Sequence, residues 1–255
     1  MTNTLFIGKV YHTFDELDST NDYARELLTK SKPPEGMAIR AVSQSAGRGQ
    51  YGSRWTSEPG KNLTISIILY PRWLAASAQF QLNEAVALAL RDTIASLPPH
   101  PDGLALSVKW PNDIWIGSRK IAGVLIQNTL KGHQLESAIV GIGLNVNQIA
   151  FPVEVANASS LALEWGQNFD PDQLANRLFE CLERRYLQLK NGQTEALHEN
   201  YREQLLGLGE ARVFMRPDGR RFQGIIQGVA ENGSLVVRTD EGDENFDLKE
   251  IAFVS

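Results

Sequence analysis

The run from Gln44 to Trp55 concentrates residues that can bind an anionic ligand. It reads Gln-Ser-Ala-Gly-Arg-Gly-Gln-Tyr-Gly-Ser-Arg-Trp, with three glycines, two arginines and a tryptophan. Glycine reaches positive φ without a Cβ clash, so neighbouring backbone N–H groups can converge on an anion, and a guanidinium can grip a phosphate or carboxylate with two parallel hydrogen bonds. The run therefore indicates a loop that holds a phosphate- or carboxylate-bearing ligand. A glycine-rich surface loop with two solvated arginines is the alternative.

The three glycines of this run also match the Gly-x-Gly-x-x-Gly spacing of a dinucleotide-binding turn. That fingerprint needs a helix at the third glycine and an acidic residue about 20 positions further on. Here a Pro-Gly pair follows, Leu63–Tyr70 is typical of a strand, and Arg72 stands where the acidic residue is expected. The spacing therefore does not indicate a nicotinamide or flavin site.

A second group of candidate residues lies at positions 109–113, which read Lys-Trp-Pro-Asn-Asp and are followed by Arg119-Lys120. A lysine is a compact cation that suits the neutralisation of carboxylate or phosphate oxygens. Asp113 could orient an amine or assist a metal ion. Lys120 could instead be a solvated hairpin lysine, and Trp110 is expected to pack in the core.

A third group, at positions 141–147, reads Gly-Ile-Gly-Leu-Asn-Val-Asn. Its glycines would let a backbone or a ligand approach a strand end that displays two amides. Further upstream, the hydroxyls of Ser19 and Thr20 are typical of a helix start, and they could serve a ligand as well. The sequence contains no recognisable Ser/His/Asp or Cys/His set, so it indicates chemistry without a protein nucleophile.

The elements that must position these groups follow from hydrophobic periodicity and turn residues. Short turns between successive β-rich runs predict antiparallel neighbours. From Ala211 onward, strong turn residues at close spacing predict a small β-barrel of about 45 residues. Strands are expected over Leu5–Thr13, Met37–Ser43, Leu63–Tyr70, Leu104–Trp110, Ile114–Gly117, Lys120–Thr129 and Gln134–Val146. Helices are expected after the Asp18–Asn21 cap segment as far as Pro33, over Ala78–Leu97, from Asp170-Pro171 onward, and over Thr194–Leu206.

Composition bounds the class of protein. With 255 residues and 42% hydrophobic composition, the chain can bury a core, and its formal net charge of −5 argues against a general polyanion binder. Met1–Val10 lacks the pattern of a secretion signal and no run approaches about 18 apolar residues, so a cytoplasmic location is expected. The single cysteine, Cys181, is expected to be buried filler. One cysteine excludes an internal disulfide framework and a Cys-rich zinc site. The four histidines are scattered without ligand spacing, so a metal held by histidines is not expected.

The three groups, in this order and with Asp18–Asn21 upstream, resemble the biotin-protein ligase family, also called biotin-[acetyl-CoA-carboxylase] ligases. The resemblance runs from about Asp18 to Asn147 and extends to the C-terminal strands. It implies an α+β fold: a class II synthetase-like catalytic domain (1–207) with a mixed, largely antiparallel sheet and helices packed on one face, plus a small C-terminal SH3-like β-barrel (208–255). Because only 17 residues precede Asp18, a form without an N-terminal DNA-binding domain is expected.

The resemblance also implies a reaction and its participants. Members make biotinyl-5'-AMP from biotin and ATP with Mg²⁺, then transfer the biotin to one lysine of a biotin carboxyl carrier domain. We expect no protein metal ligands and no tightly bound prosthetic group. The acidic net charge and the short segment before Asp18 argue against a nucleic-acid partner, and the lack of a long apolar run argues against a membrane partner. The oligomeric state is left open between a monomer and a homodimer. The residues that the resemblance assigns to catalysis are Lys120, Arg48 and Asp113. Those assigned to biotin are Ser19, Thr20, Asn21, Gln44, Gly47, Arg48, Gly49, Gln50 and Lys120. Those assigned to ATP are Arg48, Arg54, Trp55, Lys109, Asn112 and Asn145.

The chemistry of these residue types agrees with biotin. Its ureido group has two N–H donors and one carbonyl acceptor, which the hydroxyls and amide of Ser19, Thr20 and Gln44 can satisfy. Adenylation brings a carboxylate against the α-phosphate, so it demands positive charge, which Arg48 and Lys120 can supply if they converge on one cavity. Lipoate-protein ligases and octanoyl transferases share the architecture and are the alternative, although their substrates lack the ureido group.

The glycine-rich loop departs from the common family pattern. Gln50, Tyr51 and Ser53 stand where arginines or lysines are frequent. Fewer charges should weaken the electrostatic hold of the loop on an adenylate. We therefore expect retention of the adenylate to depend on loop ordering and side-chain contacts.

Overall fold

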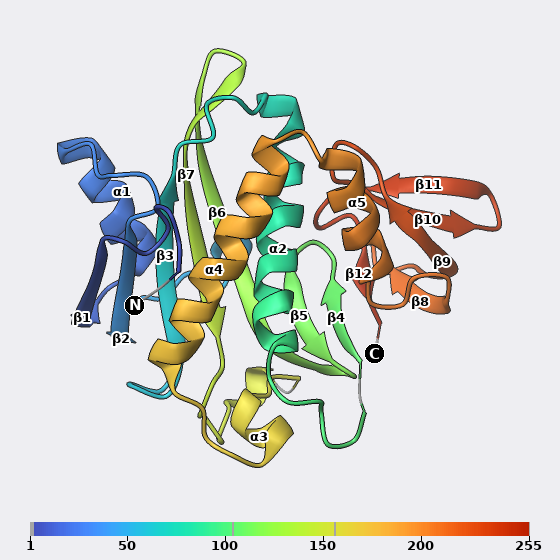
Figure 1. Cartoon of the computed structure of the whole chain (residues 1–255). Helices are drawn as coiled ribbons and strands as arrows, with labels where there is room; N and C mark the ends of the chain where they lie inside the picture. Colours follow the sequence, from blue (N-terminus) through green and yellow to red (C-terminus); the bar gives the residue numbers. More distant parts are fainter. Residues whose placement is uncertain (1–2, 104, 156, 255) are drawn as a thin grey trace.

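The computed structural model describes residues 3–103, 105–155 and 157–254, and it places them in two sheets and five α-helices (Figure 1). The larger sheet has seven strands in the order β1-β2-β3-β7-β6-β5-β4. Its only parallel pair among these strands is β1 with β2. The strands are β1 (Tyr11–Leu17), β2 (Ala38–Gln44), β3 (Leu63–Leu69), β4 (Leu106–Lys109), β5 (Asp113–Ile116), β6 (Arg119–Lys131) and β7 (Gln134–Leu144).

Helices lie on both faces of this sheet. The long helices α2 (Gln79–Ala95) and α4 (Pro171–Lys190) lie side by side over one face, as Figure 1 shows, and they cover the main core. Helix α1 (Thr20–Lys30) packs on the opposite face, where Ala24 meets Ile68 and Ile139 in a smaller core. Helices α2 and α4 are therefore the ones that match the predicted helices packed on one face of the sheet, and α1 lies on the other face. Because successive side chains of a strand point to opposite faces, a strand covered on both faces is buried along its whole length, as β3 is.

The helix starts follow the side-chain caps that the sequence predicts. The Ser19 hydroxyl accepts the Asp22 N–H at the start of α1, and Asp170 accepts the Asp172 N–H at the start of α4. A short helix that the sequence did not predict, α3 (Leu161–Trp165), begins at a Ser160 cap. The buried side chain of Cys181 in α4 confirms its prediction as core filler. Local capping chemistry therefore sets where these helices begin.

Two predicted boundaries are wrong because tertiary partners replace local structure. The predicted strand Leu5–Thr13 begins only at Tyr11, since the backbone N–H groups of Phe6 and Ile7 donate to the Glu183 carboxylate on α4 at 2.8 and 3.1 Å. Helix α5 (Thr194–Glu203) ends before Leu206 because the next residues pair with β4, where Leu206 N–H donates to the Val108 carbonyl at 2.9 Å. Leu104, at the start of another predicted strand, lies outside the described residues.

The C-terminal segment forms a second, antiparallel sheet in the order β11-β10-β9-β8-β12. The Trp110 indole is buried in the seam between the two sheets and donates to the Gly233 carbonyl at 2.9 Å, which confirms its predicted place in the core. The division at residue 207 stays a prediction. The strands are β8 (Ala211–Met215), β9 (Arg221–Val229), β10 (Leu235–Thr239), β11 (Gly242–Phe246) and β12 (Ala252–Phe253).

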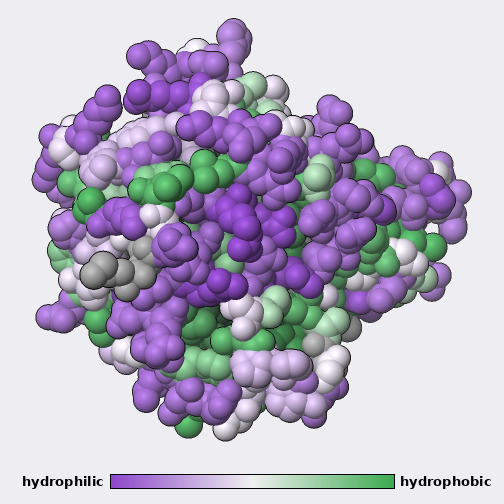
Figure 2. Space-filling view, viewed as in Figure 1, coloured by the Kyte–Doolittle hydropathy of each residue, from purple (hydrophilic) through white to green (hydrophobic). Residues whose placement is uncertain are grey.

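The outer surface over α2 and α4 is largely hydrophilic (Figure 2). This agrees with the amphipathic pattern of α4, whose buried residues Leu174, Leu178, Leu182 and Leu189 face the core. None of the described helices combines the length and apolar character needed to cross a membrane.

Candidate active site

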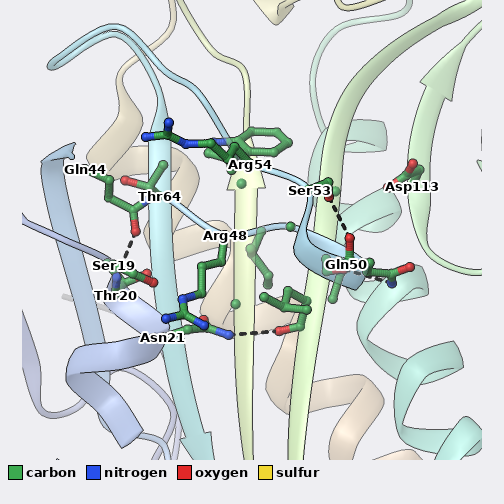
Figure 3. A pocket seen from close by; sticks show the side chains of 18 of the residues that line it. Ser19, Thr20, Asn21, Gln44, Arg48, Gln50, Ser53, Arg54, Thr64 and Asp113 are labelled. Carbon is green, nitrogen blue, oxygen red and sulfur yellow. Dashed lines mark hydrogen bonds between the residues drawn. The ribbon is translucent and has the colours of Figure 1, made fainter. Parts of the chain in front are cut away.

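A cavity of about 220 Å³ opens on the α1 face of the large sheet. Its floor is formed by β3, β6 and β7, and its walls are the start of α1 and the glycine-rich loop (Figure 3). The two cations that the sequence predicts to converge, Arg48 and Lys120, both line it. The predicted residues that line the cavity are Ser19, Thr20, Asn21, Gln44, Arg48, Gly49, Gln50, Arg54, Trp55, Asp113 and Lys120.

The α1 end of the cavity is a fixed set of hydroxyls and amides. The Ser66 hydroxyl lies 2.6 Å from Asn21 Oδ1 and 2.7 Å from Thr20 Oγ1. Ser66 has one proton, and an amide oxygen can only accept, so Ser66 donates to Asn21 and Thr20 donates to Ser66. The Thr20 N–H donates to Gln44 Oε1 at 2.8 Å. Thr20 therefore keeps oxygen lone pairs for a ligand N–H, and Gln44 keeps its NH₂ group for a ligand carbonyl.

The glycine-rich loop folds into a small hairpin over the cavity. Trp55 N–H donates to the Gly47 carbonyl at 3.0 Å, and Gly49 N–H donates to the Ser53 carbonyl at 2.8 Å. A Cβ on Gly47 would lie 2.3 Å from the Trp55 carbonyl oxygen, so the two arms approach this closely only because the residue is glycine. Hydrogen bonds between the two arms of the loop backbone thus hold the hairpin together.

Arg48 reaches from this loop toward α1. Its Nε lies 2.5 Å from Asp22 Oδ2, and its side chain is 50% exposed. Figure 3 shows the Arg48 side chain directed toward the Asn21 end of the cavity, while Asp113 lies on the far side, beyond Gln50. A half-exposed guanidinium with one acidic partner can exchange that partner for a ligand anion at modest cost.

Lys120 lies in β6 with its ammonium held by a neighbouring carboxylate. Its Nζ lies 2.6 Å from Asp113 Oδ2 of β5. A Cβ on Gly123 would lie 3.0 Å from Asp113 Oδ1 and 3.2 Å from Lys120 Nζ, so this glycine leaves room for the pair. The Lys120 backbone is fixed as well, since its N–H donates to the Asn157 carbonyl and its carbonyl accepts the Ser159 N–H, at 2.7 and 2.8 Å. The cation is therefore positioned before any ligand enters.

Two glycines of β7 form part of the floor. A Cβ on Gly141 would lie 2.1 Å from Asn21 Oδ1, and a Cβ on Gly143 would lie 2.3 Å from the Trp55 indole. The Gly-Ile-Gly motif thus lets Asn21 and Trp55 approach the sheet, as its residue types suggested.

Gly141→Ala is expected to displace Asn21 and to lower the free energy of unfolding by about 1–3 kcal/mol, the usual cost of overpacking. Urea unfolding measures this loss. In the double variant with Asn21→Ala the clash is absent, so its destabilisation should be smaller than the sum of the two single effects. Additive losses would contradict the contact between Gly141 and Asn21.

Four predicted residues lie beside the cavity. Gly47 lines an adjoining hollow of the loop, and Asn112 lines a neighbouring cavity at the seam between the sheets. The Asn145 side chain is buried and donates to the Ser159 carbonyl at 2.9 Å. Lys109 lies over the rings of Trp115 and Phe253, and burial there lowers the pKa of its amine. Ligand contacts for these four residues stay predictions.

The sequence did not single out three residues that shape the site. Thr64 lines the cavity, Ser66 connects Thr20 with Asn21, and Gly123 makes room for the Lys120–Asp113 pair. The signals were present: two polar residues at alternate positions of the apolar strand β3, and a glycine in the interior of β6.

Comparisons with known proteins agree with this geometry. A model of the Biotin/lipoate A/B protein ligase family matches residues 13–145. The chain is 34% identical over 240 residues to the bifunctional ligase/repressor BirA of Bacillus subtilis, covering 91% of this chain and 70% of that protein. It is 30% identical to the biotin–[acetyl-CoA-carboxylase] ligase of Paracoccus denitrificans, covering 92% and 97%. The structure of the Aquifex aeolicus biotin protein ligase in complex with biotin and ATP superposes with a TM-score of 0.76 at 26% identity, covering 96% and 99%.

An α+β fold shared with solved ligases, and a cavity that combines amides with two cations, place this chain among the protein ligases. The chain belongs to the Biotin/lipoate A/B protein ligase family, whose matching segment spans the glycine-rich loop, the Lys-Trp-Pro-Asn-Asp segment and the Gly-Ile-Gly strand.

Proposed function

We propose that this protein is a biotin–[acetyl-CoA-carboxylase] ligase, which activates biotin with ATP as biotinyl-5'-AMP and transfers it to a lysine of a biotin carboxyl carrier domain. The observation that carries the proposal is one shared cavity that is lined by two cations, Arg48 and Lys120, together with the hydroxyls and amides at the start of α1. The similarity to ligases of the same name over most of both chains supports it.

The polar end of the cavity complements the ureido group of biotin. A ureido group offers two N–H donors and one carbonyl acceptor. The Thr20 hydroxyl proton is used by Ser66, so the Thr20 oxygen retains lone pairs for a ligand N–H. The Gln44 carbonyl oxygen is used by the Thr20 backbone N–H, so Gln44 retains its NH₂ group for a ligand carbonyl. A lipoyl or octanoyl chain would leave these groups unpaired, which costs free energy in a buried site.

Thr20→Val is expected to weaken biotin binding roughly tenfold, because a near-isosteric methyl replaces an acceptor and leaves a ureido N–H unpaired. Isothermal titration with biotin measures the change. Thr29→Val is the matched control: it lies on the same helix, where its hydroxyl donates to the Glu26 carbonyl on the exposed side. Equal affinities of Thr20→Val and the wild type would remove Thr20 from biotin recognition.

In the first half-reaction a carboxylate oxygen of biotin attacks the α-phosphorus of ATP, and pyrophosphate leaves with the electron pair of the broken P–O bond. The two reactants repel each other, so the protein must supply positive charge and in-line positioning. Lys120 and Arg48 supply the charge from opposite sides of the cavity. Mg²⁺ enters as part of the nucleotide substrate, on phosphate oxygens, which are its usual ligands.

In the second half-reaction the acceptor lysine amine attacks the acyl carbon, and AMP leaves as the C–O bond breaks. The amine gives up a proton in this step. Asp113 lines the cavity and has one carboxylate oxygen on Lys120. Its other oxygen can hold the incoming amine or take its proton. The carrier domain, a cytoplasmic location and a monomeric or homodimeric state are part of the same proposal.

Intact-mass analysis of a purified biotin carboxyl carrier domain tests the whole proposal. After incubation with the protein, biotin, ATP and Mg²⁺, the carrier should gain the mass of one biotinyl group, and omission of ATP should abolish the gain. Lipoate in place of biotin should give little product. A carrier that takes lipoate but not biotin would assign the protein to the lipoate branch of the family.

A further inference from the structure

A chain of side-chain amides links the glycine-rich loop to the helix layer on the other face of the sheet. Gln50 Nε2 donates to Asn112 Oδ1 at 3.1 Å. Asn112 Nδ2 then donates to Asn83 Oδ1 of α2 at 2.5 Å, and Asn83 Nδ2 donates to the Pro111 carbonyl at 2.9 Å. We call these three side chains, Gln50, Asn112 and Asn83, the amide relay.

The Pro111 carbonyl fixes the direction of every bond in the amide relay. A carbonyl can only accept, so Asn83 must turn its NH₂ group toward Pro111 and its oxygen toward Asn112. Asn112 must then turn its oxygen toward Gln50, which meets it with an NH₂ group. The carbonyl itself is held from α5, where the buried Tyr201 hydroxyl donates to it at 2.6 Å. A flipped amide anywhere in the relay would place two like groups in contact.

The relay ends at the tip of the loop. Gln50 also donates to the Val124 carbonyl of β6 at 3.3 Å, and the Ser53 hydroxyl donates to the Gln50 carbonyl at 2.7 Å. Gln50 lines both the active-site cavity and the neighbouring seam cavity of about 530 Å³. The tip of the loop is therefore held at the border of the two cavities by neutral hydrogen bonds.

We propose that Asn83 is a positioning residue for the glycine-rich loop, acting through Asn112 on Gln50. Asn112 is only 2% exposed, so loss of a partner leaves a nearly buried amide group unsatisfied. Without Asn83 the Asn112 amide can flip, and Gln50 then loses its acceptor. The relay therefore orders the tip of the loop through neutral hydrogen bonds. Its effect on catalysis rests on the proposed function; its effect on the loop does not.

Limited trypsin digestion of the ligand-free protein tests the relay directly, because Arg48 and Arg54 flank the tip and are both cleavage sites. Asn83→Ala should raise the rate of loop cleavage about three- to tenfold, as expected for loss of one hydrogen bond that holds the closed loop. Gln50→Leu should have a similar effect. Asn128→Ala is the matched control, since Asn128 lines the same seam cavity but donates to Gln79, outside the relay.

The double variant Gln50→Leu with Asn83→Ala separates positioning from general stability. It should be cleaved at the rate of Gln50→Leu alone, because Asn83 acts through Gln50. The proposal would be overturned if the increases in cleavage rate of the two single variants multiplied in the double variant. It would also be overturned if Asn83→Ala were cleaved at the wild-type rate. Asn83→Ser, which is too short to join Asn112 and Pro111, is taken through the same cycle, so that a folding defect of the alanine variant does not decide the result.

Adenylate escape supplies the catalytic readout. With biotin and MgATP, Asn83→Ala should release free biotinyl-AMP about three- to tenfold faster than wild type, with an unchanged KM for biotin. An unchanged release rate would overturn the effect on catalysis. If the wild type makes no biotinyl-AMP, the proposed function fails, and the cleavage cycle still decides the relay.

Discussion

Lys120→Met is expected to lower the rate of adenylate formation by about 10²–10³-fold, the usual cost of removing one preorganised group that stabilises developing charge. Methionine keeps the length and apolar stem of lysine but removes the cation. Lys120 lies in a strand beside a glycine and its side chain is 32% exposed, so the fold should persist. Single-turnover measurement of biotinyl-AMP, with near-UV circular dichroism to verify the fold, gives the result.

Lys131→Met is the matched control for this substitution. Lys131 ends the same strand, β6, and is exposed far from the lining of the cavity. Its variant should form adenylate at the wild-type rate. If Lys120→Met kept normal turnover, Lys120 would have no part in the chemistry and the cavity would need another cation.

Arg48→Met is expected to reduce kcat/KM roughly 30-fold, because a charge-assisted hydrogen bond contributes about 2 kcal/mol. Steady-state kinetics with varied biotin and ATP measure the change. The loss should be visible with both substrates, since the loop covers the place where they meet. Unchanged dependence on both would contradict a role for Arg48 over the ligand.

Arg25→Met provides a close control for Arg48→Met. Both arginines pair with Asp22 at 2.5 Å, and their side chains are 53% and 50% exposed. Only Arg48 lines the active-site cavity. A comparable loss in both variants would mean that Asp22, and through it the start of α1, carries the effect.

Local sequence signals were sufficient for much of this architecture. Caps such as Ser19 and Asp170, and the β-rich apolar runs of β3 and β7, depend on neighbours in the chain, so they can be recognised without coordinates. That Arg48 and Lys120 line one cavity was also predictable, because the proposed chemistry requires positive charge around the reacting carboxylate and phosphate. The structure agrees in placing both at one cavity.

Features that depend on distant partners could not be predicted. No local pattern shows that Glu183 accepts hydrogen bonds from the backbone N–H groups of Phe6 and Ile7, which lie 177 and 176 residues away in the sequence. These bonds keep both residues out of β1. The end of α5 depends likewise on pairing with β4. The amide relay joins residues from three separate segments, and only the fold brings them together. Side-chain chemistry indicated which groups react, and tertiary structure determined how they are held.

The central claim is that the cavity between Arg48 and Lys120 joins a biotin carboxylate to the α-phosphate of ATP. Exchange of labelled pyrophosphate into ATP by the purified protein measures that step without any acceptor. The account predicts exchange that requires biotin and Mg²⁺ and that is far weaker with lipoate. Exchange that is independent of biotin, or no exchange from a folded protein that binds both substrates, would contradict it.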